Sequence, residues 1–192
     1  RGTVLPFLYN DYEGLAKLVE ANDVGVIKME VSRNFGPENN FLEKVRELAT
    51  SRGIVLIFDE CTSGFRETFG GLHKLYGVEP DMAMFGKAMG NGYAITAVIG
   101  RREVMESAQT SFISSTFWTE RIGPTAALKT LEVMERTQSW EIVTKIGRDV
   151  SARWRSLASD HNLLITTAGL AALPTFAFSG NNADAYKTLL TQ

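Results

Sequence analysis

The chain has 192 residues, 44% of them hydrophobic, which is enough to bury a core in one domain or in one domain with the edge of another. Its 20 basic and 22 acidic residues leave a net charge of −2, so no electrostatic excess indicates a nucleic acid or an anionic membrane as partner. A single cysteine excludes an internal disulfide, and two distant histidines form no metal-ligand cluster. We therefore expect a globular protein of the reducing cytoplasm, without a metal.

No segment of the sequence resembles a membrane-spanning helix or a secretory signal. No run reaches the roughly 20 apolar residues that cross a bilayer, and the first residues lack the apolar segment of a secretory signal. The chain begins without Met in an apolar stretch and ends inside an expected helix. We expect a soluble piece of a longer protein, cut at both ends.

Helices and apolar strands alternate along the first hundred residues. Apolar side chains at helical spacing predict helices over 11–22 and about 38–52, with Gly53 as the C-terminal cap of the second. Apolar runs typical of buried parallel strands follow both helices. Four strands are expected, over residues 24–31, 54–58, 81–86 and 94–100.

The second half begins with a short helix near Arg101 and a polar loop, followed by a long helical pattern from Gly123 to about Ser159 in which Gly147 is a candidate interruption. From Leu163 onward the segments are strand-like. We expect an α/β protein. A mainly parallel sheet flanked by helices would occupy residues 1–160, and a smaller α+β domain would start over 161–192.

Asp59 and Lys87 both follow expected strands. Asp59 ends the run I-V-L-I-F, and Lys87 opens the small-residue loop K-A-M-G-N-G. Ligands of open α/β sheets lie outside the carboxyl ends of the strands. By itself, Asp59 is explained as well by a structural role, as a helix cap or an ion-pair partner of Arg66, as by a functional one. A lysine beside a loop that lets backbone approach a flat ligand favours a cofactor site.

Pyridoxal 5′-phosphate (PLP) chemistry uses such a pair. A lysine amine holds the aldehyde of the cofactor as an imine, and a carboxylate keeps the pyridine nitrogen protonated so that the ring takes up electrons. The freed lysine then moves a proton between the substrate and the cofactor. The pair Asp59 and Lys87 therefore predicts PLP as cofactor.

Three segments in order resemble the hallmark segments of the class III aminotransferases, and in particular the branch of glutamate-1-semialdehyde aminomutase-like proteins. They read I-V-L-I-F-D-E-C-T-S-G-F-R, P-D-M-A-M-F-G-K-A-M-G-N-G-Y and S-S-T-F-W-T-E-R, within a similarity that runs from about Val24 to Met134. The resemblance implies an incomplete large domain of PLP fold type I. It also implies amino-group transfer to or from a small amine or amino acid, by a transaminase or a 1,2-aminomutase, and a homodimer.

The resemblance also implies residue roles. Lys87 is the catalytic lysine that forms the internal aldimine, and Asp59 binds the pyridine nitrogen. Cys61 stands where the family usually has a Val that packs against the ring. A small buried apolar residue is the simpler interpretation of Cys61 than a nucleophile or a redox centre. Thr116 matches the threonine that reaches the cofactor phosphate of the neighbouring subunit. Its alternative is a loop residue that caps the helix after Gly123.

Neighbouring residues are expected to support this site. Glu60 matches an acid of the family, and Arg66 is a candidate partner for Glu60 or for Glu30. His73 is expected in a hydrogen-bonded or solvated structural role. The aromatic residues of the loops are candidate pocket walls that more often simply pack, namely Tyr93, Phe117 and Trp118.

Two other functions compete. A nucleotide-linked α/β enzyme would need a Gly-rich turn of the form G-x-G-x-x-G, and none occurs. A catalytically inactive scaffold or interaction domain would have no reason to keep both Asp59 and Lys87. The loop that cradles the phosphate, the aromatic that stacks on the ring and the residues that bind the substrate carboxylate are expected outside this chain.

Overall fold

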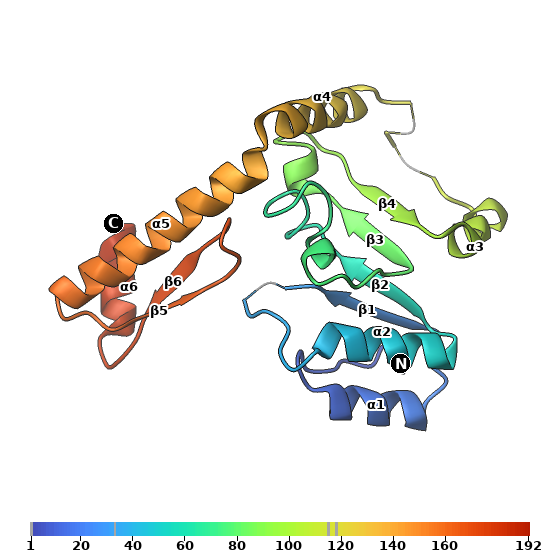
Figure 1. Cartoon of the computed structure of the whole chain (residues 1–192), viewed down its shortest axis with the longest axis horizontal. Coiled ribbons are helices and arrows are strands. Elements are labelled where there is room, and N and C mark those ends of the chain that lie inside the picture. The colour runs from blue at the N-terminus through green and yellow to red at the C-terminus, as the bar shows by residue number, and fades with distance from the viewer. Residues whose placement is uncertain (1, 33, 115, 118) are drawn as a thin grey trace.

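The computed structural model describes residues 2–32, 34–114, 116–117 and 119–192. Its elements come in the order expected from the sequence (Figure 1). The helices are α1 (Tyr12–Ala21), α2 (Phe41–Arg52), α3 (Arg102–Met105), α4 (Ile122–Thr137), α5 (Ser139–Asp160) and α6 (Ala183–Thr191). The strands are β1 (Val26–Glu30), β2 (Val55–Asp59), β3 (Met82–Phe85), β4 (Ala97–Gly100), β5 (Ile165–Ala168) and β6 (Thr175–Phe178).

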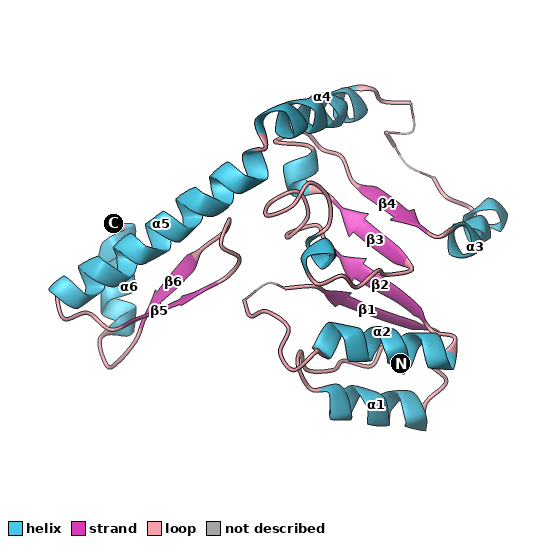
Figure 2. Ribbon diagram, viewed as in Figure 1, coloured by secondary structure: helices cyan, strands magenta, loops and turns pink. Residues whose placement is uncertain are grey.

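The larger sheet has the strand order β1-β2-β3-β4. β1, β2 and β3 run parallel, and β4 pairs antiparallel with β3 at the edge. α1 and α2 lie next to β1 and β2, and α3 lies at the end of β4, as Figure 2 shows. The predicted α/β class with a mainly parallel sheet is confirmed.

The two faces of this sheet differ in burial. Alternate residues of β1 and β2, such as Ile27 and Phe58, pack against α1 and α2 in the main hydrophobic core. Residues of opposite phase, such as Lys28, Ile57 and Asp59, are exposed or half-buried. Polar side chains of the strands therefore lie on one accessible face of the sheet.

The long helical pattern of the second half is interrupted at Gln138 and not at Gly147. Gln138 adopts the left-handed conformation with φ of 49° between α4 and α5. Gly147 lies inside α5, where an added Cβ would be 1.8 Å from the carbonyl oxygen of Ala171. The glycine therefore allows a close helix-to-loop contact and does not bend the helix.

A small unit follows α5 near the C-terminus (Figure 1). β5 and β6 form an antiparallel pair, which contacts α5 and α6. Leu170, in the turn between the two strands, joins the main core, and the backbone N–H of Ala172 donates to the Glu67 carboxylate at 3.0 Å. The boundary after residue 160 stays a prediction. None of the described helices is long and apolar enough to cross a membrane.

Candidate active site

Asp59 and Lys87 lie at the same edge of the sheet. Asp59 is the last residue of β2 and pairs with Met84 of β3, while Lys87 begins two residues after the end of β3. The backbone N–H of Glu60 continues this pairing by donating to the carbonyl of Met84 at 2.8 Å. Because β2 and β3 are parallel, both functional groups reach the carboxyl edge, as the sequence predicted.

Lys87 adopts an unusual backbone conformation. Its φ of 45° lies in the left-handed region, at the start of a short 3-10 turn over Lys87–Met89. Such a conformation costs a non-glycine residue about 1 kcal/mol or more and is concentrated at functional sites. The side chain is exposed, and its Nζ donates to the Thr62 Oγ1 at 2.7 Å. Thr62 thus holds the amine on the side of the β2 edge.

The Asp59 carboxylate is bound by two donors. Its Oδ2 accepts from the Lys28 Nζ at 2.7 Å, and its Oδ1 accepts from the backbone N–H of Cys61 at 3.2 Å. Desolvation acts to raise the pKa of Asp59, but the hydrogen bonds from Lys28 and Cys61 outweigh it and lower the pKa below its ordinary value. Asp59 is therefore an anion at neutral pH. Its ion-pair partner is Lys28 and not Arg66.

Cys61 lies close both to Asp59 and to the residue before Lys87. Its Sγ would be 3.5 Å from a Cβ added to Gly86, the residue that precedes Lys87. Burial and the negative charge of Asp59 raise the pKa of the thiol. A protonated, half-buried thiol is consistent with the simpler reading of Cys61 as a small packing residue.

Glu60 is fully buried and organises the loop that follows β2. Its carboxylate accepts from the Ser63 hydroxyl, and from the backbone N–H and the Nδ1 of His73 at 3.0 and 2.8 Å. Arg66 is not its partner, because the guanidinium Nε donates to the backbone carbonyl of Thr62 at 2.9 Å. His73 is hydrogen-bonded in a structural role, as expected.

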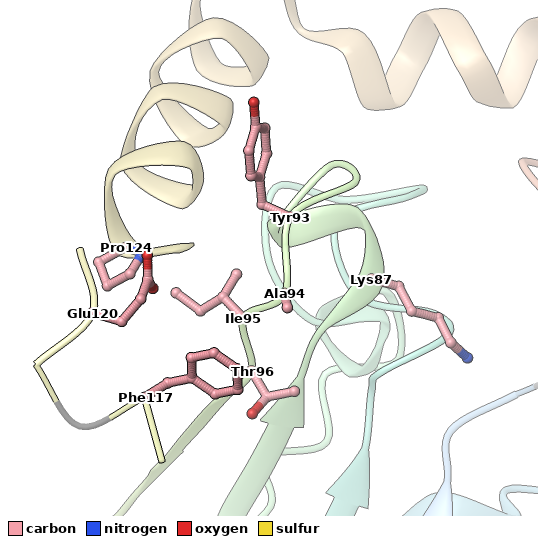
Figure 3. Close-up of a pocket in the computed structure, with 8 residues that line it drawn as sticks. All are labelled: Lys87, Tyr93, Ala94, Ile95, Thr96, Phe117, Glu120 and Pro124. Carbon is pink, nitrogen blue, oxygen red and sulfur yellow. The ribbon is translucent and has the colours of Figure 1, made fainter. Parts of the chain in front are cut away.

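Two cavities adjoin Lys87. One, of about 590 Å³, is lined in part by Tyr93, Ile95, Phe117 and Glu120. Figure 3 shows the Lys87 side chain extending away from these residues. A larger cavity, of about 900 Å³, lies between the Gly90–Tyr93 loop and α4 and α5. Lys87 thus contributes to the lining of both cavities, while its amine binds Thr62.

Thr116 is an exposed turn residue before α4, and no hydrogen bond joins it to the group around Lys87 among the described residues. The start of α4 offers it little help in binding an anion, because the Glu120 carboxylate already accepts from the backbone N–H groups of Ile122 and Gly123. Trp118 lies outside the described residues. No group of described side chains could hold a metal ion.

Two residues of this site were missed in the sequence. The alternation of β1 places Lys28 and Glu30 on one face, which is the signal that could have identified Lys28. Thr62 carries no comparable signal, because its contact with Lys87 depends on how the loop after β2 folds back.

The profile of the family described as "Aminotransferase class-III" matches residues 33–188. The 3-aminobutyryl-CoA aminotransferase of Cloacimonas acidaminovorans is 38% identical over 98% of this chain and 48% of its own length. The glutamate-1-semialdehyde 2,1-aminomutase of Methanothermobacter thermautotrophicus is 34% identical over 93% of this chain and 44% of its own length. The chain thus spans about half the length of these curated relatives.

Solved structures show the same fold. The PLP internal aldimine form of the FumI protein of Sphingopyxis sp. MTA144 superposes with a TM-score of 0.87 at 24% identity, over 94% of this chain and 45% of that one. An ornithine delta-aminotransferase of Plasmodium falciparum gives a TM-score of 0.84 at 22% identity, over 97% of this chain and 50% of that one.

Proposed function

Because the chain belongs to the class-III aminotransferase family, we propose that the protein transfers amino groups with PLP as its cofactor, as a transaminase or a 1,2-aminomutase. The observation that carries this proposal is the meeting of Asp59 and Lys87 at the carboxyl edge of β2 and β3. One relative is named as an aminotransferase and another as an aminomutase, and both names support this reaction class. The substrate is an amine or amino acid.

The residues at this edge fit the cofactor. Asp59 is held as an anion, which is the state that a protonated pyridine nitrogen needs in its partner. Lys87 is exposed and has a left-handed backbone at the start of a turn that leads into a loop containing Gly90 and Gly92. An exposed amine and a fixed carboxylate on one face of a sheet suit a flat ring bound at both ends.

When bound, PLP supplies an aldehyde that bonds to amines and a ring that takes up electron density. Lys87 would hold the cofactor through its Nζ and, once released, carry a proton to or from the substrate carbon. Asp59 would accept a hydrogen bond from the ring nitrogen. Thr62 would orient the free amine of Lys87, and Cys61 would lie beside the ring.

We also propose that the protein is a cytoplasmic homodimer. Thr116 would bind the cofactor phosphate of a second subunit, which makes the enzyme a homodimer. Its exposed position and its distance in sequence from Lys87 are consistent with a role across an interface. The single half-buried thiol suits the reducing cytoplasm.

Titration with PLP, followed by absorbance, tests the proposal. The protein should develop the visible band of lysine-bound PLP, the Lys87→Ala variant should not, and Asp59→Asn should bind with at least about tenfold lower affinity because it loses a charge-assisted hydrogen bond. A band that persists in Lys87→Ala would favour the inactive scaffold, since PLP would then be reacting with surface lysines.

A further inference from the structure

Lys28 is the only basic residue of β1. Its side chain leaves the accessible face of β1 and forms an ion pair with Asp59, with the Nζ 2.7 Å from the Oδ2. In the strand register Lys28 pairs with Ile57, so it reaches Asp59 diagonally. Its side chain is 51% exposed and that of Asp59 is 22% exposed, so water reaches the pair from one side.

The ion pair engages the carboxylate on which the proposed function depends. The two oxygens of Asp59 already accept from Lys28 and from the backbone N–H of Cys61. A carboxylate oxygen has two lone pairs, so Asp59 can accept from a further donor such as a ring nitrogen. That donor must share the carboxylate with Lys28. Glu30 lies directly opposite Asp59 in the register, and its negative charge also acts on Lys28.

We propose that Lys28 is a positioning residue of the cofactor site, whose ion pair with Asp59 competes with the ring nitrogen of PLP and disfavours protonation of that nitrogen. This inference rests on the proposed function. Lys28 acts through Asp59 and does not itself touch the reacting atoms.

The charges at the site explain the direction of the effect. The hydrogen bond to Asp59 raises the pKa of Lys28 against the opposing effect of desolvation, so Lys28 is a cation at neutral pH. An ammonium on the same carboxylate repels a protonated ring nitrogen and offsets part of the negative charge that would stabilise it. Lys28 would thus lower cofactor affinity and weaken the ring as an electron acceptor.

Three variants separate this role from a purely structural one. Lys28→Met removes the charge and keeps an unbranched chain, Lys28→Arg keeps the charge, and Lys17→Met removes an equal charge from the exposed side of α1 as control. Circular dichroism confirms that each variant is folded. PLP affinity is measured by absorbance titration, and protonation of the ring nitrogen by the ¹⁵N chemical shift of ring-labelled PLP.

Lys28→Met should bind PLP about three- to tenfold more tightly, the size expected for one charge interaction at a half-exposed pair. Its ¹⁵N shift should move toward the pyridinium value, while Lys28→Arg and Lys17→Met stay near the parent protein. Equal or weaker binding by Lys28→Met, or an unchanged ¹⁵N shift, overturns the role of Lys28 alone if the parent carries PLP on Lys87. A parent that takes no PLP on Lys87 overturns both the proposed function and this inference.

Discussion

The fully buried carboxylate of Glu60 is bound by His73 through two hydrogen bonds, one from the backbone N–H at 3.0 Å and one from the Nδ1 at 2.8 Å. These bonds join the two ends of the loop over residues 60–73, and Glu60 directly follows Asp59. The same loop carries Thr62, which binds the Lys87 amine, and Cys61, which lies near Gly86, so its geometry fixes both residues.

Glu60→Gln should lower the free energy of unfolding by about 2 to 3 kcal/mol, because an amide cannot accept from all the donors that the buried carboxylate satisfies. Urea unfolding measures the loss. The matched control is Glu79→Gln: Glu79 is 72% exposed and lies 3.6 Å from the other ring nitrogen of His73, so its loss should cost less than about 0.5 kcal/mol. Equal losses in the two variants would contradict the account of the loop.

The stability of the parent protein and that of Glu60→Gln should depend differently on pH. Burial acts to raise the pKa of Glu60, but hydrogen bonds from His73 and Ser63 bring it below its ordinary value of 4.5. The carboxylate therefore stabilises the fold above that value, and this contribution disappears as the pH falls through the lower pKa of the folded state. The stability gap between the parent and Glu60→Gln should shrink from about pH 5 to about pH 3. A gap that widens on acidification would show the opposite shift.

Thr62→Val should slow the attachment of PLP to Lys87 by about three- to tenfold, because the amine loses the hydroxyl that holds it 2.7 Å away. Thr62→Ser keeps a hydroxyl and should stay within about twofold of the parent. Stopped-flow absorbance measures the rate. If the Ser and Val variants behave alike, the hydroxyl does not orient the amine.

Gly147→Ala should destabilise the protein by about 1 to 3 kcal/mol, although alanine is the better helix former. An added Cβ would meet the backbone carbonyl of Ala171 at 1.8 Å, so α5 must move away from the turn between β5 and β6. Gly25→Ala is the control, since nothing lies within 4 Å of its added Cβ. Thermal unfolding gives the comparison, and a Gly147→Ala protein as stable as the parent would refute the close contact.

Cys61 is the single cysteine and reports on the site by alkylation. Its pKa is raised above the ordinary 9.0, so the rate of reaction with iodoacetamide should keep rising beyond pH 9. Bound PLP should slow the reaction at least about threefold by covering the thiol. The protection should vanish in Lys87→Ala, and a rate that ignores PLP in the parent would place the ring elsewhere.

The sequence predicted the sheet and its helices well because periodicity reflects local burial. The run I-V-L-I-F over 54–58 became β2 over Val55–Asp59, and Gly53 caps α2 with a φ of 66°. The interruption of the long helix was placed wrongly, at Gly147. A glycine in a helical pattern has two explanations, and the contact that decides between them lies 24 residues away at Ala171.

The candidate site was predicted in part for the same reason. Asp59 and Lys87 follow apolar strands, so strand ends alone bring them to one edge. The partners of Asp59 and Glu60 depend on strand register and on the return of the loop, which no local pattern encodes. Arg66 was therefore only a candidate partner for these acids, whereas Lys28 and His73 fill that role.

Borohydride reduction of the protein with PLP, followed by peptide mapping by mass spectrometry, identifies the lysine that holds the cofactor. We expect a reduced PLP adduct on Lys87 and its loss in Lys87→Ala. An adduct on the neighbouring Lys28, or label spread over the surface lysines with none at Lys87, would contradict the assignment of Lys87 as the residue that holds the cofactor.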